Sequence, residues 1–424
     1  MKQRSIPGGV TNSNLYSMLH IIKNKPEVER VISDVIIVGA GIIGAACARV
    51  LASAGVGVTV IDRGTTAGGT SSACEGNLLV SDKGPGHELV LAQHAARLWR
   101  STVTDLREQL GDGFPSVEFD PKGGVVVATT AAGASSLLDF VAGQRLAGVD
   151  ARVIDASEAR GLEPDLTARI EAAVYYPEDA QVQPAIATEA LMASARLYGA
   201  RLLENTPVLG PLLDSAGSLI GVTTPAGELR GRRVLVAAGP WSGEVAGLLG
   251  VRLPVRPRRG ELLVTTRMRH RIFHKVYDAD YVGAVGSDDG ALQTSSVVES
   301  TGSGTVLIGS SRRLVGFDAR LRVDVLSEIA AKAIRLFPFL ADASVMRSYG
   351  GFRPFMPDHL PVISEDPRMP GLWYATGHEG AGIGLSLATA ELILDLMLGR
   401  PTRIDAAPYS AARASLAPYL EAVA

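Results

Sequence analysis

The stretch ATGHEGAGIG at residues 375–384 places a histidine and a glutamate among four glycines. Imidazole and carboxylate groups are common choices for orienting a ligand or transferring its protons. Glycines at this density let the backbone come close to a group that is not protein. We therefore take His378 and Glu379 as candidate catalytic residues beside a bound ligand. The alternative is a turn-forming pair whose side chains satisfy nearby backbone groups.

Residues 34–63, DVIIVGAGIIGAACARVLASAGVGVTVIDR, predict a strand, a glycine turn, a helix and a second strand. The apolar, β-branched run at residues 35–38 is typical of a parallel strand covered on both faces. An Ala- and Leu-rich helix follows, and residues 56–61 predict the next strand. The run 35–61 is long enough to span a membrane, but its glycines, Arg49 and its change of periodicity argue against a span.

Three glycines in this segment have the spacing G-x-G-x-x-G: Gly39, Gly41 and Gly44. Such glycines permit a tight turn, close approach of a pyrophosphate and close helix packing, while the helix N-terminus favours phosphate charge. Asp62 ends the second strand, where a carboxylate can accept hydrogen bonds from both ribose hydroxyls. The pattern predicts dinucleotide binding, and the alternative is glycine-rich packing in an ordinary βαβ unit. The next loop, GTTAGGTSSACEGNLL at residues 64–79, suits a second contact with an extended cofactor.

The composition of the chain limits the classes of molecule that we expect it to bind. The chain has 424 residues, 20% of them charged, and a formal net charge of −3, so no basic face indicates nucleic acid or an anionic membrane. Cys47 and Cys74 are the only cysteines, which excludes a disulfide framework, and no His, Cys or carboxylate cluster has metal-ligand spacing. Residues 1–33 lack the order of a secretory signal. We expect a cytoplasmic protein with small-molecule partners and no transmembrane segment.

Further segments continue the α/β pattern, and a β-rich region interrupts it. A helix is expected over residues 188–198, and residues 234–237 predict a buried strand that runs into Gly239 and Trp241. Alternating apolar patterns such as GGVVVATT, GELLVTT and GTVLIGSS indicate a mostly antiparallel sheet elsewhere. A nucleotide-binding domain is thus interrupted by a β-rich one.

Taken together, these residues resemble the FAD-dependent amine oxidoreductases of the D-amino-acid oxidase and glycine oxidase superfamily. The segments that carry the resemblance occur in order along about residues 34–400: the first glycine motif, Asp62, GGTSS, DAQVQPAIATEALMASARLYGA, VLVAAGPWS, LPVRPRRGELLVT, GGFRPFMPDHLPVI and ATGHEGAGIG. GTVLIGSSRRLVGFD and GHEGAGIG are most similar to the flavin-carrying β subunits of opine, D-hydroxyproline and hydrogen cyanide synthase dehydrogenases. Those subunits typically work with partner subunits that carry further redox centres.

The resemblance implies an α/β FAD-binding domain, Rossmann-like and of the glutathione-reductase type, interwoven with an α+β substrate domain built on a mostly antiparallel sheet. The expected division is an N-terminal extension at residues 1–33, a discontinuous FAD-binding domain at 34–115, 180–250 and 346–424, and a substrate-binding domain at 116–179 and 251–345.

The implied cofactor is noncovalent FAD, because some relatives tether the flavin through a late cysteine and this sequence has none after Cys74. The late glycine turn would lie beneath the isoalloxazine, and the N-terminus of the helix that follows would stabilise negative charge on the reduced ring. The residues expected to contact FAD are Gly39, Ala40, Gly41, Ile42, Ile43, Gly44, Asp62, Arg63, Gly69, Thr70, Ser71, Gly76, Asn77, Leu78, Val208, Ala238, Gly239, Trp241, Gly377, His378, Glu379, Gly380, Gly382 and Ile383.

Two residues are expected to bind substrate. The family counterpart of Arg353 binds the substrate carboxylate, a task that suits a guanidinium with two parallel donors. The alternative pairs Arg353 with an acidic neighbour such as Asp358. Tyr277 and Tyr281 can line the pocket, although aromatic residues on a β-rich layer are more often core. Tyr281 is taken as the second substrate-binding candidate.

The implied reaction is oxidation of a C–N bond by transfer of a hydride from the α carbon of a small amino acid or secondary amine to FAD, which gives an imine. The substrate is an opine, a D-amino acid, glycine or a hydroxyproline-like compound. Electrons then pass to partner subunits or, alternatively, to oxygen. Two other readings stay open: a noncatalytic subunit that only binds FAD, and an NAD-binding dehydrogenase.

Overall fold

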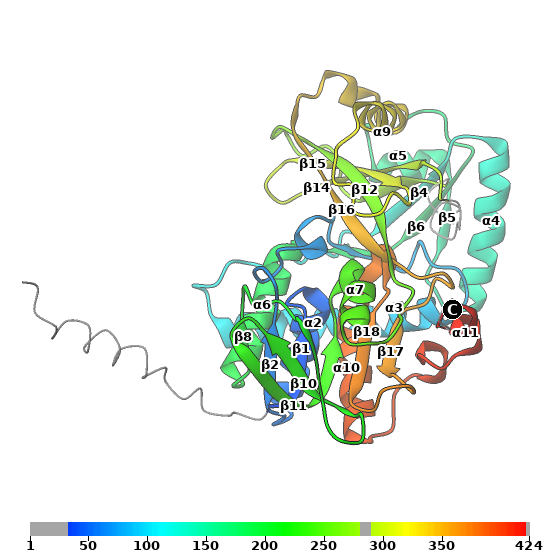
Figure 1. Cartoon of the computed structure of the whole chain (residues 1–424). Helices are drawn as coiled ribbons and strands as arrows, with labels where there is room; N and C mark the ends of the chain where they lie inside the picture. The colour runs from blue at the N-terminus through cyan, green and yellow to red at the C-terminus, as the bar shows by residue number, and fades with distance from the viewer. Residues whose placement is uncertain (1–32, 280–289, 421–424) are drawn as a thin grey trace, which may run out of the picture.

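The computed structural model describes residues 33–279 and 290–420 (Figure 1). The expected extension lies outside the described residues except for Ser33, which begins the first strand, and Tyr281 also lies outside them. The described residues form two eight-stranded sheets and one two-stranded sheet, β3 (Asn77–Leu78) with β7 (Ala180–Gln181).

The first sheet is parallel at its centre, as the glycine-motif segment predicts. Its strands lie in the order β17-β18-β11-β1-β2-β8, with β10 and β9 added antiparallel beside β11. The central strand β1 is buried and runs parallel to β2 and β11, pairing Val35 with Val58 and Arg233. The bounds are β1 (Ser33–Val38), β2 (Val58–Ile61), β8 (Arg201–Leu203), β9 (Gly210–Leu213), β10 (Leu219–Thr224), β11 (Gly227–Val236), β17 (Val362–Glu365) and β18 (Leu372–Thr376).

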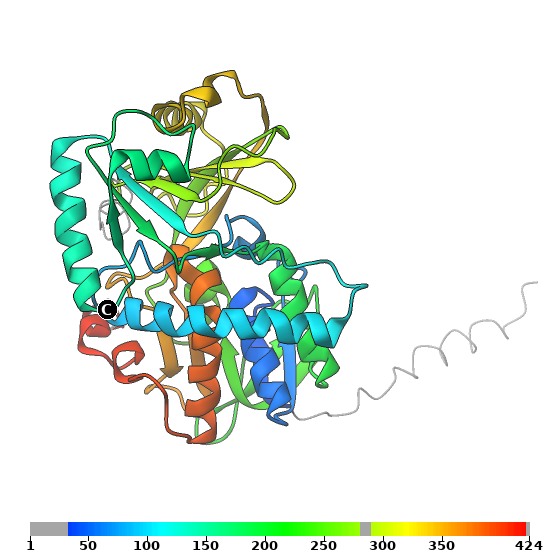
Figure 2. The same ribbon diagram turned by 180° about the vertical axis from the view of Figure 1, so that it is seen from behind.

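Helices cover both faces of this sheet. On one face α2 (Ile42–Ser53) packs between α6 (Pro184–Leu197) and α10 (Gly382–Leu398), and the long helix α3 (His87–Leu110) crosses over them (Figure 2). On the opposite face, α7 (Ser242–Leu248) packs against β11. The helix expected over residues 188–198 is α6, which starts four residues earlier because Pro184 takes its first position.

The second sheet is mostly antiparallel, in the order β16-β12-β15-β14-β13-β4-β6-β5, and its only parallel pair among the described strands is β4 with β13. Helix α9 (Val323–Leu336) packs on it through buried residues spaced three or four apart. The strands of this sheet and two further helices beside it are β4 (Gly124–Ala128), α4 (Ala131–Leu146), β5 (Arg152–Ile154), α5 (Ala156–Leu162), β6 (Ala172–Tyr176), β12 (Arg256–Thr265), β13 (Lys275–Asp278), β14 (Gln293–Ser300), β15 (Val306–Arg312) and β16 (Val345–Phe355).

Strand β16 departs from the expected division of the chain. It pairs with β12 along its length, from Arg256 opposite Phe355 to Thr265 opposite Val345. The boundary expected at residue 346 therefore falls inside a strand of the second sheet. The sequence of this strand, VMRSYGGFRPF, has little apolar alternation, so its pairing with β12 rather than its own pattern defines it. We assign residues 345–355 to the second sheet and keep the rest of the division as a proposal.

Helix α10 is unusually apolar. The span Glu379–Leu398 is long and apolar enough to cross a membrane, with a mean hydropathy of 1.7. However, 56% of the most apolar 18-residue stretch of this span is buried inside the protein, where α10 contacts α2 and α3. A helix that is apolar on all sides is also what the centre of a helical layer requires, and we interpret α10 as a core helix.

Candidate functional site

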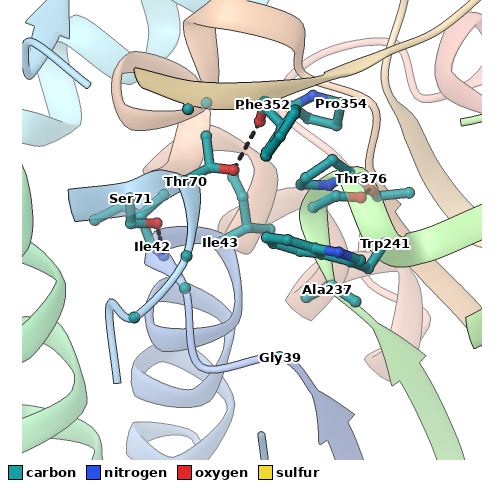
Figure 3. Close-up of a pocket in the computed structure, with 18 of the residues that line it drawn as sticks. Gly39, Ile42, Ile43, Thr70, Ser71, Ala237, Trp241, Phe352, Pro354 and Thr376 are labelled. Carbon is teal, nitrogen blue, oxygen red and sulfur yellow. Dashed lines mark hydrogen bonds between the residues drawn. The ribbon is translucent and has the colours of Figure 1, made fainter. Parts of the chain in front are cut away.

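A cavity of about 560 Å³ lies between the two large sheets (Figure 3). Its lining comes from the carboxyl ends of β1, β2, β11 and β18 on one side and from β12 and β16 on the other. In open α/β sheets, ligands bind at this carboxyl edge. The volume is within the range of cofactor and small-molecule sites, which run from about 300 to about 1,000 Å³.

Most of the residues expected to bind a cofactor meet around this cavity, although they come from five separate stretches of the chain. The lining includes Gly39, Gly41, Ile42, Ile43, Asp62, Arg63, Gly69, Thr70, Ser71, Gly76, Asn77, Val208, Ala238, Gly239, Trp241, His378, Glu379, Gly380, Gly382 and Ile383. Four expected residues are not in the lining: Ala40, Gly44, Leu78 and Gly377. Their contribution is to packing and to the shape of the backbone.

The start of α2 is packed too tightly for side chains. A Cβ at Gly39 would lie 2.4 Å from the Ala237 carbonyl oxygen, and one at Gly44 would lie 1.9 Å from the Gly39 carbonyl oxygen. Gly39 also has a φ of +119°, which few other residues adopt. Ile42 N–H donates to Ser71 Oγ at 2.9 Å, as Figure 3 shows. Gly41, Ile42 and Ile43 at the start of this helix line the cavity, where a helix N-terminus suits phosphate charge.

Asp62 holds the rim of the cavity beside this helix. Its Oδ2 accepts from Ala40 N–H at 2.8 Å, and its Oδ1 accepts from Gly64 N–H at 2.7 Å. These bonds orient the carboxylate and tie the turn after β1 to the turn after β2. Each carboxylate oxygen has more than one acceptor position, so the geometry is compatible with the predicted ribose contact.

An aromatic stack closes one side of the cavity and joins the two sheets. The ring of Trp241, after β11, stacks on Phe317 with centroids 5.4 Å apart and planes 6° from parallel. The Arg63 guanidinium lies 4.3 Å from the Trp241 ring centroid. Thr70 Oγ1 donates to the Phe352 carbonyl oxygen on β16 at 2.7 Å, a second link between the loop after β2 and the second sheet.

The glycines of the late turn serve two purposes. Gly377 has a φ of +86°, and a Cβ there would lie 2.4 Å from Met356 Cγ. A Cβ at Gly384 would lie 3.2 Å from the Asn77 carbonyl oxygen. These two glycines are therefore explained by packing against protein, whereas Gly380 and Gly382 border the cavity.

His378 lines the cavity, but helix α10 engages its ring. Its Nε2 lies 2.9 Å from Thr389 Oγ1, and 3% of the residue is exposed. Burial lowers the pKa of His378 to about 3, so the imidazole is neutral near pH 7. The catalytic role of His378 stays a prediction; in this structure its ring contacts Thr389 of α10 and is hard to protonate.

Glu379 is also held by protein partners. Its Oε1 lies 2.8 Å from His359 Nδ1, and its Oε2 lies 3.7 Å from Arg258 Nη1 on β12. Its φ of +47° is uncommon for a residue with a side chain. Both predicted catalytic residues thus line the cavity with side chains that contact other side chains of the protein, and their catalytic role stays a prediction.

Arg353 lies in the cavity wall contributed by β16. Its Nη1 donates to the Ser311 carbonyl oxygen at 2.8 Å, and a Cβ at Gly380 would lie 3.3 Å from its Nε. The alternative partner, Asp358, binds Arg413 instead, with Nε to Oδ2 at 2.6 Å and Nη2 to Oδ1 at 2.9 Å. The suggested pairing with Asp358 is therefore excluded, and Arg353 reaches the late turn from the second sheet.

Several lining residues were missed from the sequence. Phe352, Pro354 and Thr376 border the cavity because β16 and the end of β18 face each other, which no local pattern indicates. Glu75 also borders it, and here a signal existed: a carboxylate within a loop otherwise rich in Gly and Ser.

Comparison with known proteins identifies the family of the chain. A family model described as "FAD dependent oxidoreductase" matches residues 34–396. The chain belongs to this family. It is 33% identical to a glycine oxidase of Pseudomonas aeruginosa over 392 residues, which covers 89% of this chain and 98% of that protein. The crystal structure of glycine oxidase from Geobacillus kaustophilus superposes with a TM-score of 0.81 at 29% identity, covering 90% of this chain and 98% of that one.

A third relative is the hydrogen cyanide synthase subunit HcnC of Pseudomonas aeruginosa. It is 31% identical over 276 residues, which covers 64% of this chain and 62% of that protein. The predicted superfamily, the FAD-binding fold and the dependence on FAD are confirmed. The residues around the cavity fit FAD, because the tight, side-chain-poor start of α2 and the bare start of α10 lie at the same cavity.

Two further residues are structural. Tyr277 is fully buried, and its hydroxyl donates to Asp179 Oδ2 at 2.7 Å, so it is a core residue. Cys74 lines the cavity, and burial raises the pKa of its thiol to about 12, which keeps it protonated and unreactive. Among residues 33–279 and 290–420, no group of three or more His, Cys, Asp or Glu side chains has the arrangement of a metal site.

The buried imidazole makes a testable contribution to pH-dependent stability. Between pH 6.5 and about 3, folded His378 binds fewer protons than the unfolded chain, so stability falls as the pH falls through this window. His378→Asn removes the titration and keeps a hydrogen-bonding side chain. We expect wild type to lose about 2 kcal/mol more than this variant between about pH 7 and about pH 5, measured by urea unfolding.

The matched control is His270→Asn, because His270 is an exposed histidine. It should retain the wild-type dependence of stability on pH. An unchanged dependence in His378→Asn would contradict the structural role given to this ring.

Proposed function

We propose that this FAD-dependent oxidoreductase oxidises the C–N bond of a small amino acid or secondary amine. One observation carries the proposal: the Arg353 guanidinium lies in the wall of the FAD cavity, beside Gly380 of the late turn. A guanidinium at that position suits a carboxylate on the substrate. The glycine oxidase relatives support the substrate class.

Bound FAD supplies a hydride acceptor, and the protein's own groups position the reactants. The start of α2, Ser71 and Asp62 would hold the phosphates and ribose, while Gly380, Gly382 and the N-terminus of α10 would lie at the flavin end. The helix N-terminus stabilises negative charge without moving a proton. Arg353 would orient the substrate, and the buried lining would exclude water from the reacting carbon. We further propose that FAD is held noncovalently, since the only cysteine in the lining is the protonated Cys74.

The fate of the electrons has two candidates. Similarity to a hydrogen cyanide synthase subunit over 64% of the chain favours transfer to partner subunits, as for the β subunits of related dehydrogenases. The alternative is an oxidase that acts alone, and oxygen uptake by the purified protein would favour it. We also propose a cytoplasmic location, in keeping with two cysteines and no disulfide between them.

The reaction class can be tested by bleaching. We expect anaerobic addition of glycine, D-amino acids, hydroxyproline or opines to the purified, yellow protein to abolish the flavin absorption for at least one compound, because the amine reduces the flavin. The release of an imine-derived carbonyl product identifies the bond that is oxidised. Persistent yellow colour with every amine would instead favour a noncatalytic FAD-binding subunit.

Arg353→Leu tests the carboxylate contact with whichever amine bleaches the protein. Loss of two charge-assisted hydrogen bonds should raise the Michaelis constant about 100-fold, equivalent to about 3 kcal/mol. Arg347→Leu is the control, since Arg347 is exposed on the same strand. A Michaelis constant that Arg353→Leu leaves unchanged would remove the assignment.

A further inference from the structure

Lys275 and Glu299 form a buried ion pair in the second sheet. Lys275 begins β13, Glu299 lies near the end of β14, and both are adjacent to the cross-strand pair of Val276 and Val298. Lys275 Nζ lies 2.7 Å from Glu299 Oε2, and 1% and 0% of the two side chains are exposed. Removing two charges from water is costly, and an apolar pair of similar volume is often at least as stable. Stability alone therefore does not explain this pair.

The ion pair lies on the face of the second sheet that is turned toward the first sheet. Successive side chains of a strand point to opposite faces. Val276 and Val298 belong to the core beneath α9, whereas Tyr277 and Val297 belong to the core that also contains β1 and α2. The two charged residues are each two positions from Tyr277 or Val297, so they share this second face. The charges thus lie inside the protein, on the side of the cofactor-binding sheet.

Asn77 connects the ion pair to the wall of the cavity. Its Oδ1 accepts a hydrogen bond from Lys275 Nζ, and its Nδ2 donates to Glu75 Oε2 at 3.2 Å. An ammonium group can only donate, so the amide oxygen must face Lys275 and the amide nitrogen faces Glu75. Asn77 lines the cavity, and its carbonyl oxygen would lie 3.2 Å from a Cβ at Gly384 in the first turn of α10. Lys275 is therefore one hydrogen bond behind the end of the cavity where α10 begins.

This end of the cavity is where the reduced cofactor would carry its charge. We place the isoalloxazine at Gly380 and Gly382, and Asn77 and Gly380 also border one small pocket together, so they are neighbours. Reduction of FAD by a hydride adds two electrons and one proton, which leaves one negative charge on the cofactor. In a buried site, charges interact more strongly than they do in water. A lysine behind this wall favours the reduced cofactor, and a glutamate favours the oxidised one.

Other charged groups face the pair from neighbouring segments. Lys122 precedes β4, and its Nζ lies 3.5 Å from Oδ2 of the exposed Asp120. Burial raises the pKa of Glu299, Lys275 and Lys122 oppose this shift, and Glu75 adds to it. Burial lowers the pKa of Lys122. Loss of Lys275 therefore favours the protonated form of Glu299.

We propose that the buried pair of Lys275 and Glu299 sets the reduction potential of the bound FAD. Lys275 is a positioning residue, since it acts through its charge and through the orientation of Asn77 rather than by contact with the cofactor. Its charge raises the potential, and the charge of Glu299 lowers it. This inference goes beyond the proposed amine oxidation, because it concerns the cofactor and needs no substrate.

The midpoint potential of the FAD-loaded protein, measured by anaerobic titration against a reference dye, tests the proposal. Glu299→Gln keeps the shape of the side chain and leaves the lysine charge uncompensated. We expect the equilibrium constant for reduction of FAD to rise about 10-fold or more near pH 7, which is about 30 mV for a two-electron couple. A potential that is unchanged or lower in Glu299→Gln overturns the proposal.

Lys275→Met should shift the potential in the opposite direction. It should lower the equilibrium constant for reduction of FAD, most clearly near about pH 9, because a higher pH favours the charged form of the unpaired Glu299. The double variant, Lys275→Met with Glu299→Gln, carries no charge at either position and should return to within about 3-fold of wild type. A structural role alone would predict shifts of one sign that add in the double variant, and this result would contradict the proposal.

Two controls and one exchange complete the experiment. Lys332→Met removes a lysine of α9 on the opposite face of the same sheet, and Glu178→Gln changes an exposed glutamate; both should keep the wild-type potential. If a single variant at the pair loses FAD, the exchange Lys275→Glu with Glu299→Lys decides the matter, since it keeps an ion pair and places the carboxylate behind Asn77. We expect the exchange to lower the equilibrium constant about 10-fold, and a wild-type potential in the exchanged protein would overturn the proposal.

Discussion

The structure depends on close contact of backbone with backbone at the end of β1. Gly44 meets the carbonyl of Gly39, and Gly39 meets the carbonyl of Ala237, at distances that no side chain tolerates. This contact sets α2 directly on the sheet and brings the end of β11 beside the end of β1. Asp62 and Ser71 then tie the two following loops to the start of α2. The start of α2 thus forms an edge of the cavity that suits the phosphates of a dinucleotide.

The second sheet supplies the other wall. Strands β12 and β16 carry Gly260, Phe352 and Arg353 to the cavity, and the stack of Trp241 on Phe317 joins this wall to the first sheet. The cofactor edge and the substrate edge therefore come from different sheets, and each depends on glycines that leave room for the other. Gly380 illustrates this, because a Cβ there would lie 3.3 Å from Nε of Arg353 on β16.

The parts of this account that follow local rules could be predicted from the sequence. The first strand, the glycine spacing and Asp62 are adjacent in the chain, so their periodicity and spacing indicate the βαβ unit and its ligand edge. His378 could not be interpreted this way, because its partner Thr389 and its burial follow from how α10 packs. The boundary expected at residue 346 falls inside β16, because the pairing of this strand with β12 is not evident from its own sequence.

The central claim is that one cavity holds FAD along a path from the start of α2 to the start of α10. A crystal structure of the protein with bound FAD tests it most directly. We expect the pyrophosphate at the start of α2, beside Ile43 and Ser71, and the isoalloxazine in contact with Gly380 and Gly382. FAD bound elsewhere, or a flavin ring out of contact with both late glycines, would contradict the account.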